Sequence, residues 1–183
     1  NWPAATTTIP GSTFMESGLE TFTIPETITE IGQQAFMNCT ALKSITIPSS
    51  VKNIGASAFK GCTGISAFTV PSGVENIGNE AFFGTKATTF SIPASVTTIG
   101  QKAFNSNPSI TNFTIESGSA YSVSEDVSMI VKTSGDVVEA VSFFGNKSEI
   151  TFPANVTKIG NYFAQGSPDL VKVNIPAVSS LGN

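Results

Sequence analysis

The feature that most constrains the fold of this chain is an apolar-proline pair that returns at nearly constant intervals. The pair is Ile24-Pro25 at its first full occurrence, and later pairs fall at residues 47–48, 70–71, 92–93, 115–116, 152–153 and 175–176, with Glu116 replacing proline once. The steps between pairs are 23, 23, 22, 23, 37 and 23 residues. A period of this length is typical of solenoids, whose units bury their apolar faces only against one another. We therefore expect one continuous repeat array.

One unit shows how each coil is expected to fold. Apolar and polar residues alternate from Leu42 to Ile47, which is the pattern of a half-buried strand. Pro48 ends the strand because it has no N–H to donate, and Gly55 suits a tight corner. A short helical or 3₁₀ turn at 57–60 completes the coil. Neighbouring strands are then expected to lie about 4.7–4.9 Å apart in a parallel sheet.

Recurring aromatic and sulfur positions define the expected interior. We predict one stack of rings that contains Phe14, Phe36, Phe59, Phe82, Phe104 and Phe163. The segment at Ile9 aligns with that at Ile31, so the array begins by residue 9. Cys39 and Cys62 hold equivalent positions in adjacent coils. Two buried thiols are favoured there, although a spacing of about 5 Å also leaves a disulfide open.

The repeat can be written L-x-x-I-x-I-P-x-x-V-x-x-I-G-x-x-A-F-x-x-C, and residues 42–62 match it position by position. This motif resembles the BspA-like, or TpLRR-type, class of bacterial leucine-rich repeats, and the resemblance covers nearly the whole chain. It implies a right-handed α/β repeat solenoid that is mostly β, with a parallel sheet and short helical turns. It also implies a secreted or cell-surface bacterial protein, in a family associated with adhesion to host surface and matrix proteins. The family brings no catalytic residues, and we expect no cofactor or metal.

The step of 37 residues marks an irregular unit at 116–151. Two β-rich runs, 121–132 and 137–141, flank a turn at 133–136 that contains Gly135, which indicates a β-hairpin. In the family that this chain resembles, a degenerate unit with a hairpin often interrupts the array. We expect one solenoid over 1–183, with regular repeats at about 9–115 and 152–183. Because the chain begins and ends within a repeat, we also expect it to be part of a longer protein.

The polar strand positions are the first candidate partner-binding surface, on the concave side expected of a solenoid. This wall contains Thr23, Ser44, Thr46, Thr69, Thr89, Ser91, Asn112, Thr114 and Asn174. A protein partner is the leading hypothesis, and a glycan is an alternative, although the wall lacks a stacked aromatic platform. Threonine is also favoured at exposed strand positions and pairs well across strands, so a purely structural role stays open.

The acidic residues of the irregular unit are the second candidate surface. Six of the thirteen acidic residues fall there, and we single out Glu125, Asp126, Asp136 and Glu139 as a contact for a basic partner. Calcium binding is an alternative, although EF-hand spacing is absent. A third interpretation is a solvated hairpin that keeps an otherwise weakly charged rod in solution.

The composition excludes several functions. The chain has no histidine, its nine basic residues are all lysine, and its net charge is −4, so no basic surface exists for nucleic acid. No apolar run reaches the ~18 residues that a membrane-spanning helix needs. Catalysis lacks its usual base, so we expect no enzyme. Only Trp2, Tyr121 and Tyr162 are aromatics typical of binding hot spots, which keeps a structural spacer as the runner-up.

Overall fold

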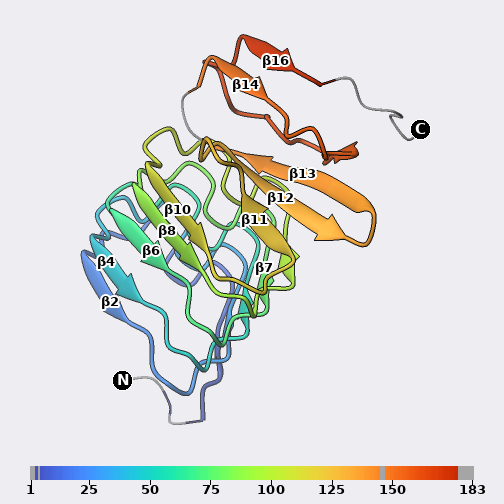
Figure 1. Ribbon diagram of the computed structural model, residues 1–183. Coiled ribbons are helices and arrows are strands. Elements are labelled where there is room, and N and C mark those ends of the chain that lie inside the picture. Colours follow the sequence, from blue (N-terminus) through green and yellow to red (C-terminus); the bar gives the residue numbers. More distant parts are fainter. Residues whose placement is uncertain (1–2, 4, 145–146, 177–183) are drawn as a thin grey trace.

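The chain forms a stack of coils made of short strands and turns (Figure 1). The computed structural model describes residues 3, 5–144 and 147–176. Within these residues no helix occurs, and most strands have two to four residues. The mostly β solenoid that the repeat predicts is therefore confirmed.

The wall strands run along one side of the stack (Figure 1). They are β2 (Thr21–Thr23), β4 (Ser44–Thr46), β6 (Ala67–Thr69), β8 (Thr89–Ile92), β10 (Asn112–Ile115), β14 (Glu149–Thr151) and β16 (Lys172–Asn174). All pairs are parallel, and the strands join in three groups: β2-β4, β6-β8-β10 and β14-β16. Thr23 pairs with Thr46, and Ser91 lies between Thr69 and Thr114. Equivalent repeat positions are therefore in register within each group.

A second parallel ladder, not foreseen from the sequence, runs along the other side of the coils. It contains β1 (Thr8–Ile9), β3 (Glu30–Ile31), β5 (Asn53–Ile54), β7 (Asn76–Ile77) and β9 (Thr98–Ile99). Ile9 pairs with Ile31, as the alignment of the first unit predicts. A Cβ placed on Gly55 would lie 2.7 Å from the backbone of Gly32, so the coils approach too closely for a side chain here. The glycine that the sequence places at a tight corner therefore allows neighbouring coils to approach closely beside this second ladder.

The segments expected to be short helical turns form hydrogen-bonded turns instead. At one equivalent position per coil φ is positive, between 56° and 60°: Ser12, Gln34, Ser57, Glu80, Lys102 and Tyr162. Glu16, Asn38 and Ser106, each four residues further on in its coil, also have φ between 58° and 60°. Helical conformations need negative φ, so each of these residues interrupts a helix. The backbone bonds run to the next coil instead, with Ser57 N donating to Asn79 O at 2.8 Å and Phe59 N to Ala81 O at 2.8 Å.

The rings of Phe14, Phe36, Phe59, Phe82 and Phe104 form the predicted interior stack. Successive centroids are 5.1, 5.4, 5.6 and 5.3 Å apart, with interplanar angles of 19° or less. The prediction that Phe163 continues this stack is wrong. The repeat order Ala-Phe is inverted there, so Phe163 takes the register of an alanine, and it packs against Phe143 and Phe152 at 6.0 and 5.2 Å. The last units thus have a separate core cluster, whose buried members are Met129, Val131, Ala140, Phe143, Ile150, Phe152, Val156 and Phe163.

The two cysteines are free, buried thiols rather than a disulfide. The Cys39 thiol donates to Phe14 O at 2.9 Å, and the Cys62 thiol donates to Phe36 O at 3.0 Å. Each thiol therefore bonds to a carbonyl of the preceding coil. Burial, reinforced by the neighbouring Cys39, raises the pKa of the Cys62 thiol to about 12.

The irregular unit contains the predicted hairpin. β11 (Tyr121–Val123), β12 (Met129–Ser134) and β13 (Val137–Phe143) are antiparallel, and β15 (Lys158–Ile159) pairs with β13 in parallel. The turn between β12 and β13 contains Gly135 at φ 58°. One face of the hairpin, through Val131 and Ala140, belongs to the second core cluster. The hairpin therefore lies between the two parts of the core.

The side chains of Asn105 and Tyr121 form hydrogen bonds that connect the irregular unit and the last coil to the earlier coils. The fully buried Asn105 amide donates to the carbonyls of Tyr162, Phe163 and Gln165 at 3.1, 3.0 and 3.0 Å. Its Oδ1 accepts the Ser142 hydroxyl at 2.7 Å. The Tyr121 hydroxyl accepts from the Ile99 N–H at 3.0 Å and donates to the Thr97 carbonyl at 3.3 Å, which caps the open edge of β9.

Candidate functional site

The wall residues lie where the strand pattern places them. In β2, β4 and β6 the first and last residues of the strand are exposed, and the central residue is half-buried or buried. Most of the candidates are exposed and the others half-buried: Thr23, Ser44, Thr46, Thr69, Asn112 and Thr114 are exposed, and Thr89, Ser91 and Asn174 are half-buried. The three strand groups bring together three, five and one of these residues respectively. The wall is thus two adjacent rows of small polar groups, with two breaks in the hydrogen bonding between its strands.

The last part of the wall differs chemically from the rest. Glu149 pairs in register with Lys172, and their charged groups lie 2.9 Å apart. The Asn174 amide donates to Glu149 Oε1 at 2.6 Å and to Thr151 Oγ1 at 3.3 Å. Hydrogen bonds from Lys172 and Asn174 lower the pKa of the Glu149 carboxyl. The hydroxyl-rich wall therefore ends in the Glu149–Lys172 ion pair, and the Asn174 amide is hydrogen-bonded to Glu149.

Sequence reasoning did not place Glu149 and Thr151 on the wall. Thr151 pairs with Asn174 and is exposed, as its counterparts in the earlier coils are. The signal was present, because residues 150–153 read Ile-Thr-Phe-Pro where 45–48 read Ile-Thr-Ile-Pro. Assigning residues up to 151 to the irregular unit concealed it.

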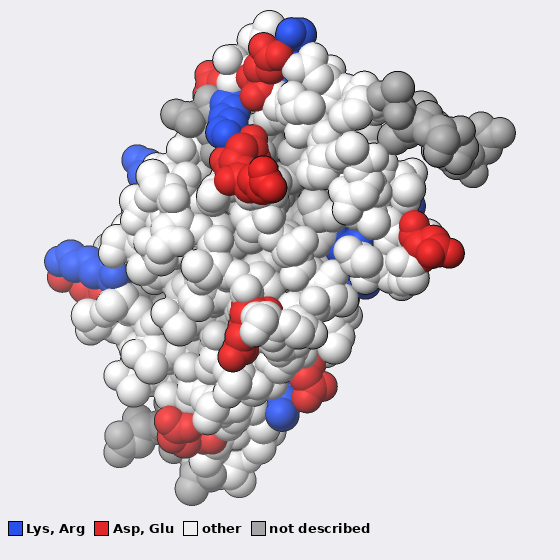
Figure 2. All heavy atoms as spheres, in the orientation of Figure 1, with Lys and Arg blue, Asp and Glu red and all other residues white. Residues whose placement is uncertain are grey.

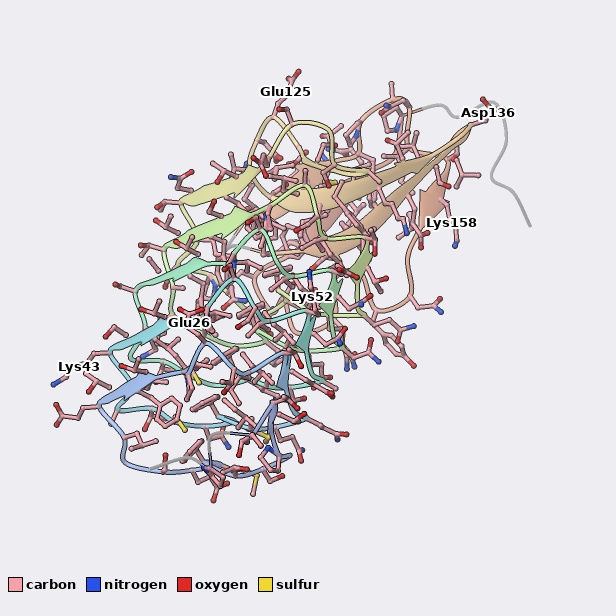
Figure 3. All side chains as sticks on the ribbon, turned by 90° about the horizontal axis from the view of Figure 1, so that it is seen from below. Glu26, Lys43, Lys52, Glu125, Asp136 and Lys158 are labelled. Atoms are coloured by element: carbon pink, nitrogen blue, oxygen red, sulfur yellow. The ribbon has the colours of Figure 1, made fainter. Side chains whose placement is uncertain are left out.

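The structure separates the four acidic hairpin candidates. Figure 3 shows Glu125 on a loop at one end of the hairpin unit and Asp136 at the far tip, and both are exposed. Glu139 forms an ion pair with Lys158 at 3.1 Å across β13 and β15. The four residues therefore do not form one contact surface. Nor does the described part of the chain contain a group of three acidic, histidine or cysteine side chains suited to a metal ion.

Asp126 is engaged within its own loop. Its carboxylate accepts the hydroxyls of Ser124 and Ser128 at 2.6 and 2.7 Å, and it pairs with Lys147 at 2.9 Å. Partial burial opposes the ionised form, but these three hydrogen bonds outweigh it and hold the pKa of Asp126 below its ordinary value. Asp126 thus organises the loop that carries Glu125.

Most lysines connect neighbouring coils. Among the described residues, seven ion pairs join seven of the nine lysines to acids 19–23 residues away in sequence. Glu80 accepts from both Lys60 and Lys102, which lowers the pKa of its carboxyl. Figure 2 shows the result on one face, where charged side chains are scattered and wide areas between them are uncharged.

An open groove of about 780 Å³ lies between the hairpin unit and the coil that begins with β14. One side is lined by residues 122–126, and the other by Glu149 and residues 151–155. Val131, Thr133 and Val138 of the hairpin lie between them. The groove contains two of the four acidic candidates, Glu125 and Asp126, and it interrupts the wall.

The three aromatic candidates have different surroundings. Tyr121 is 5% exposed and serves as the cap of β9, so it offers little surface to a partner. Tyr162 is 54% exposed, and the Lys102 ammonium lies 5.1 Å from its ring centroid. Trp2 lies outside the described residues.

Parallel coils, a strand wall on one side and a phenylalanine core define the class of leucine-rich-repeat solenoids. The sequence profile described as the BspA type leucine-rich repeat region matches residues 7–127 and 128–183 in six copies. The chain therefore belongs to this family. Among proteins with curated descriptions, none matches the chain in sequence.

Solved structures of bacterial proteins resemble this fold. A leucine-rich repeat protein from Eubacterium ventriosum superposes with a TM-score of 0.80 at 25% identity, over 92% of this chain and 45% of that one. A leucine-rich repeat protein from Bacteroides ovatus gives 0.64 at 24% identity, over 96% of this chain and 56% of that one. The pneumococcal vaccine antigen PcpA gives 0.67 at 21% identity, over 85% of this chain and 45% of that one. The chain thus spans about half the length of these proteins.

Proposed function

We propose that this chain is a protein-interaction module that binds a host surface or matrix protein outside the bacterial cell. The wall carries the proposal: its small hydroxyl and amide groups recur in fixed register on a hydrogen-bonded ladder. A rigid row of this kind needs little ordering when a partner binds, because threonine and serine have few rotamers to lose. The similarity to a vaccine antigen supports an exposed location.

The charges favour recognition by shape and hydrogen bonds. Seven lysines are engaged in ion pairs, six of them between coils, so the wall presents little net field to steer a charged partner. Binding through the wall is therefore expected to depend weakly on ionic strength.

In the described residues no helix is long and apolar enough to cross a membrane.

A structural spacer is the second candidate. The observation that favours it is the continuous phenylalanine stack reinforced by ion pairs between coils, which suits a stiff rod. A leucine-rich repeat solenoid is a repeat scaffold, and we propose no catalytic activity for this chain. A glycan-binding role, motivated by the hydroxyl and amide groups of the wall, is a third candidate that a glycan array tests directly.

The test is a binding screen against a panel of purified extracellular-matrix proteins by biolayer interferometry. The double variant Thr46→Lys/Thr69→Lys places two charges on the exposed wall. We expect it to weaken binding at least about tenfold, because each new lysine ammonium would be buried in a neutral interface without a counter-ion, which costs free energy. The control is Thr29→Lys/Thr98→Lys, at exposed positions beside and on the second ladder. Equal binding by all three proteins would reject the wall as the site.

A further inference from the structure

The edge of one wall strand has no neighbour. β14 pairs with β16, and in the part of the chain that the structure describes it pairs with no other strand. Ser148 O accepts a bond from the β16 segment at 2.9 Å, and Phe152 N donates one to it at 3.0 Å. Successive residues of a strand direct their backbone groups to opposite edges. Glu149 and Thr151 therefore present their N–H and C=O groups to the open edge.

This open edge borders the groove next to the hairpin. Glu149 and Thr151 both line the groove, and the hairpin side of it is lined by Ser122 and Val123 of β11. In a regular array the preceding wall strand would occupy this position, as β8 does beside β10. The hairpin departs from the array here, and the open groove of about 780 Å³ is left beside β14.

The lining of the groove combines apolar and acidic groups. The half-buried Val123, Val138 and Pro153 provide apolar surface, and the volume of about 780 Å³ falls within the range of roughly 300–1,000 Å³ typical of ligand pockets. The carboxylates of Glu125, Asp126 and Glu149 line it without any lysine. Asp126 and Glu149 have lysine counter-ions nearby. Among the described residues Glu125 has none, so its charge is available to a cation.

We propose that the groove binds an extended peptide segment of a protein partner, which adds to β14 as a strand. Backbone hydrogen bonds to Glu149 and Thr151 supply register, as in other β-strand additions. Alternate side chains of the peptide pack against Val123 and Val138, and a lysine or arginine of the peptide pairs with Glu125. This proposal rests on the protein-binding role proposed above and names the chemistry of the segment that is recognised.

The probe is a phage library of random dodecapeptides, selected on the intact chain and followed by fluorescence anisotropy with the selected peptides. We expect peptides with a lysine or arginine among alternating apolar residues. Glu125→Lys should weaken them about tenfold or more, and Glu125→Gln should weaken them less. The matched control is Asp136→Lys, which makes the same charge change at the hairpin tip, outside the groove. N-methylation of alternate peptide amides should also weaken binding, because it removes the strand hydrogen bonds.

The outcomes separate this inference from the proposed function. Failure to select any peptide, peptides without a basic residue, or affinities that Glu125→Lys leaves unchanged would overturn the groove proposal. Loss of matrix-protein binding in Thr46→Lys/Thr69→Lys with no effect of the groove variants would retain the wall and reject the groove. Selected peptides that depend on Glu125 while no matrix protein binds would retain the groove and reject the wall.

Discussion

Replacing Asn105 with alanine should destabilise the last coils more than any exposed asparagine substitution. The Asn105 amide donates three hydrogen bonds to carbonyls of the segment 162–165 and accepts one from Ser142. The bonds to Phe163 O and from the Ser142 hydroxyl are fully buried. Each buried group left without a partner costs about 1–3 kcal/mol, so two of them cost about 2–6 kcal/mol. The carbonyls of Tyr162 and Gln165 are only partly buried, and water can replace Asn105 there.

Urea denaturation followed by circular dichroism measures the total loss, and hydrogen exchange locates it. We expect amides of β13 and of residues 160–165 to lose protection first, since Asn105 attaches them to the earlier coils. Asn161→Ala, at an exposed position in the same segment, is the control and should change stability by less than about 0.5 kcal/mol. An Asn105→Ala protein within about 0.5 kcal/mol of the parent would refute the assigned role.

Three further predictions concern individual side chains. Tyr121→Phe removes the hydroxyl that caps β9, so it should cost about 1–2 kcal/mol and speed exchange of the β9 amides, whereas equal exchange would mean that water replaces the cap. The lowered pKa of Glu80 contributes stability that is present above the ordinary value of 4.5 and is lost as pH falls through the folded value. Glu80→Gln should therefore reduce the acid sensitivity of the melting temperature, and an unchanged profile would contradict this. Cys62 should react with a thiol reagent only after unfolding, because its thiol is buried with a pKa of about 12; rapid labelling of the native protein would disprove the buried assignment.

Much of the fold follows from the period of the sequence. A motif repeated every 22 or 23 residues requires coils to stack in register, and Thr23↔Thr46 and Ile9↔Ile31 pair accordingly. The hairpin was recognised because alternating β-formers flank Gly135. The short turns were misread as helical, because positive φ at Ser57 or Glu80 leaves no mark on residues other than glycine.

The junction could not be predicted from the repeat. The partners of the Asn105 amide lie 57 to 60 positions further along the chain, and no local pattern encodes such a contact. The position of Phe163 was predicted wrongly because the order of alanine and phenylalanine is inverted there. Counted from the glycine of the repeat, Phe163 aligns with Ala58 and not with Phe59. The groove was also missed, since it depends on the edge that the hairpin leaves open beside β14.

The contact between the turns at Asn105 and Tyr162 has a consequence for how such arrays change. Ser106 Oγ donates to Gly166 O at 2.8 Å, so one coil joins another across an excursion of some sixty residues. The excursion is anchored at its base, and its turn at Gly135 points away from the stack (Figure 1). A loop that doubles in length costs only about 0.6 kcal/mol more to close. A longer hairpin tip should therefore leave the register of the coils on either side unchanged.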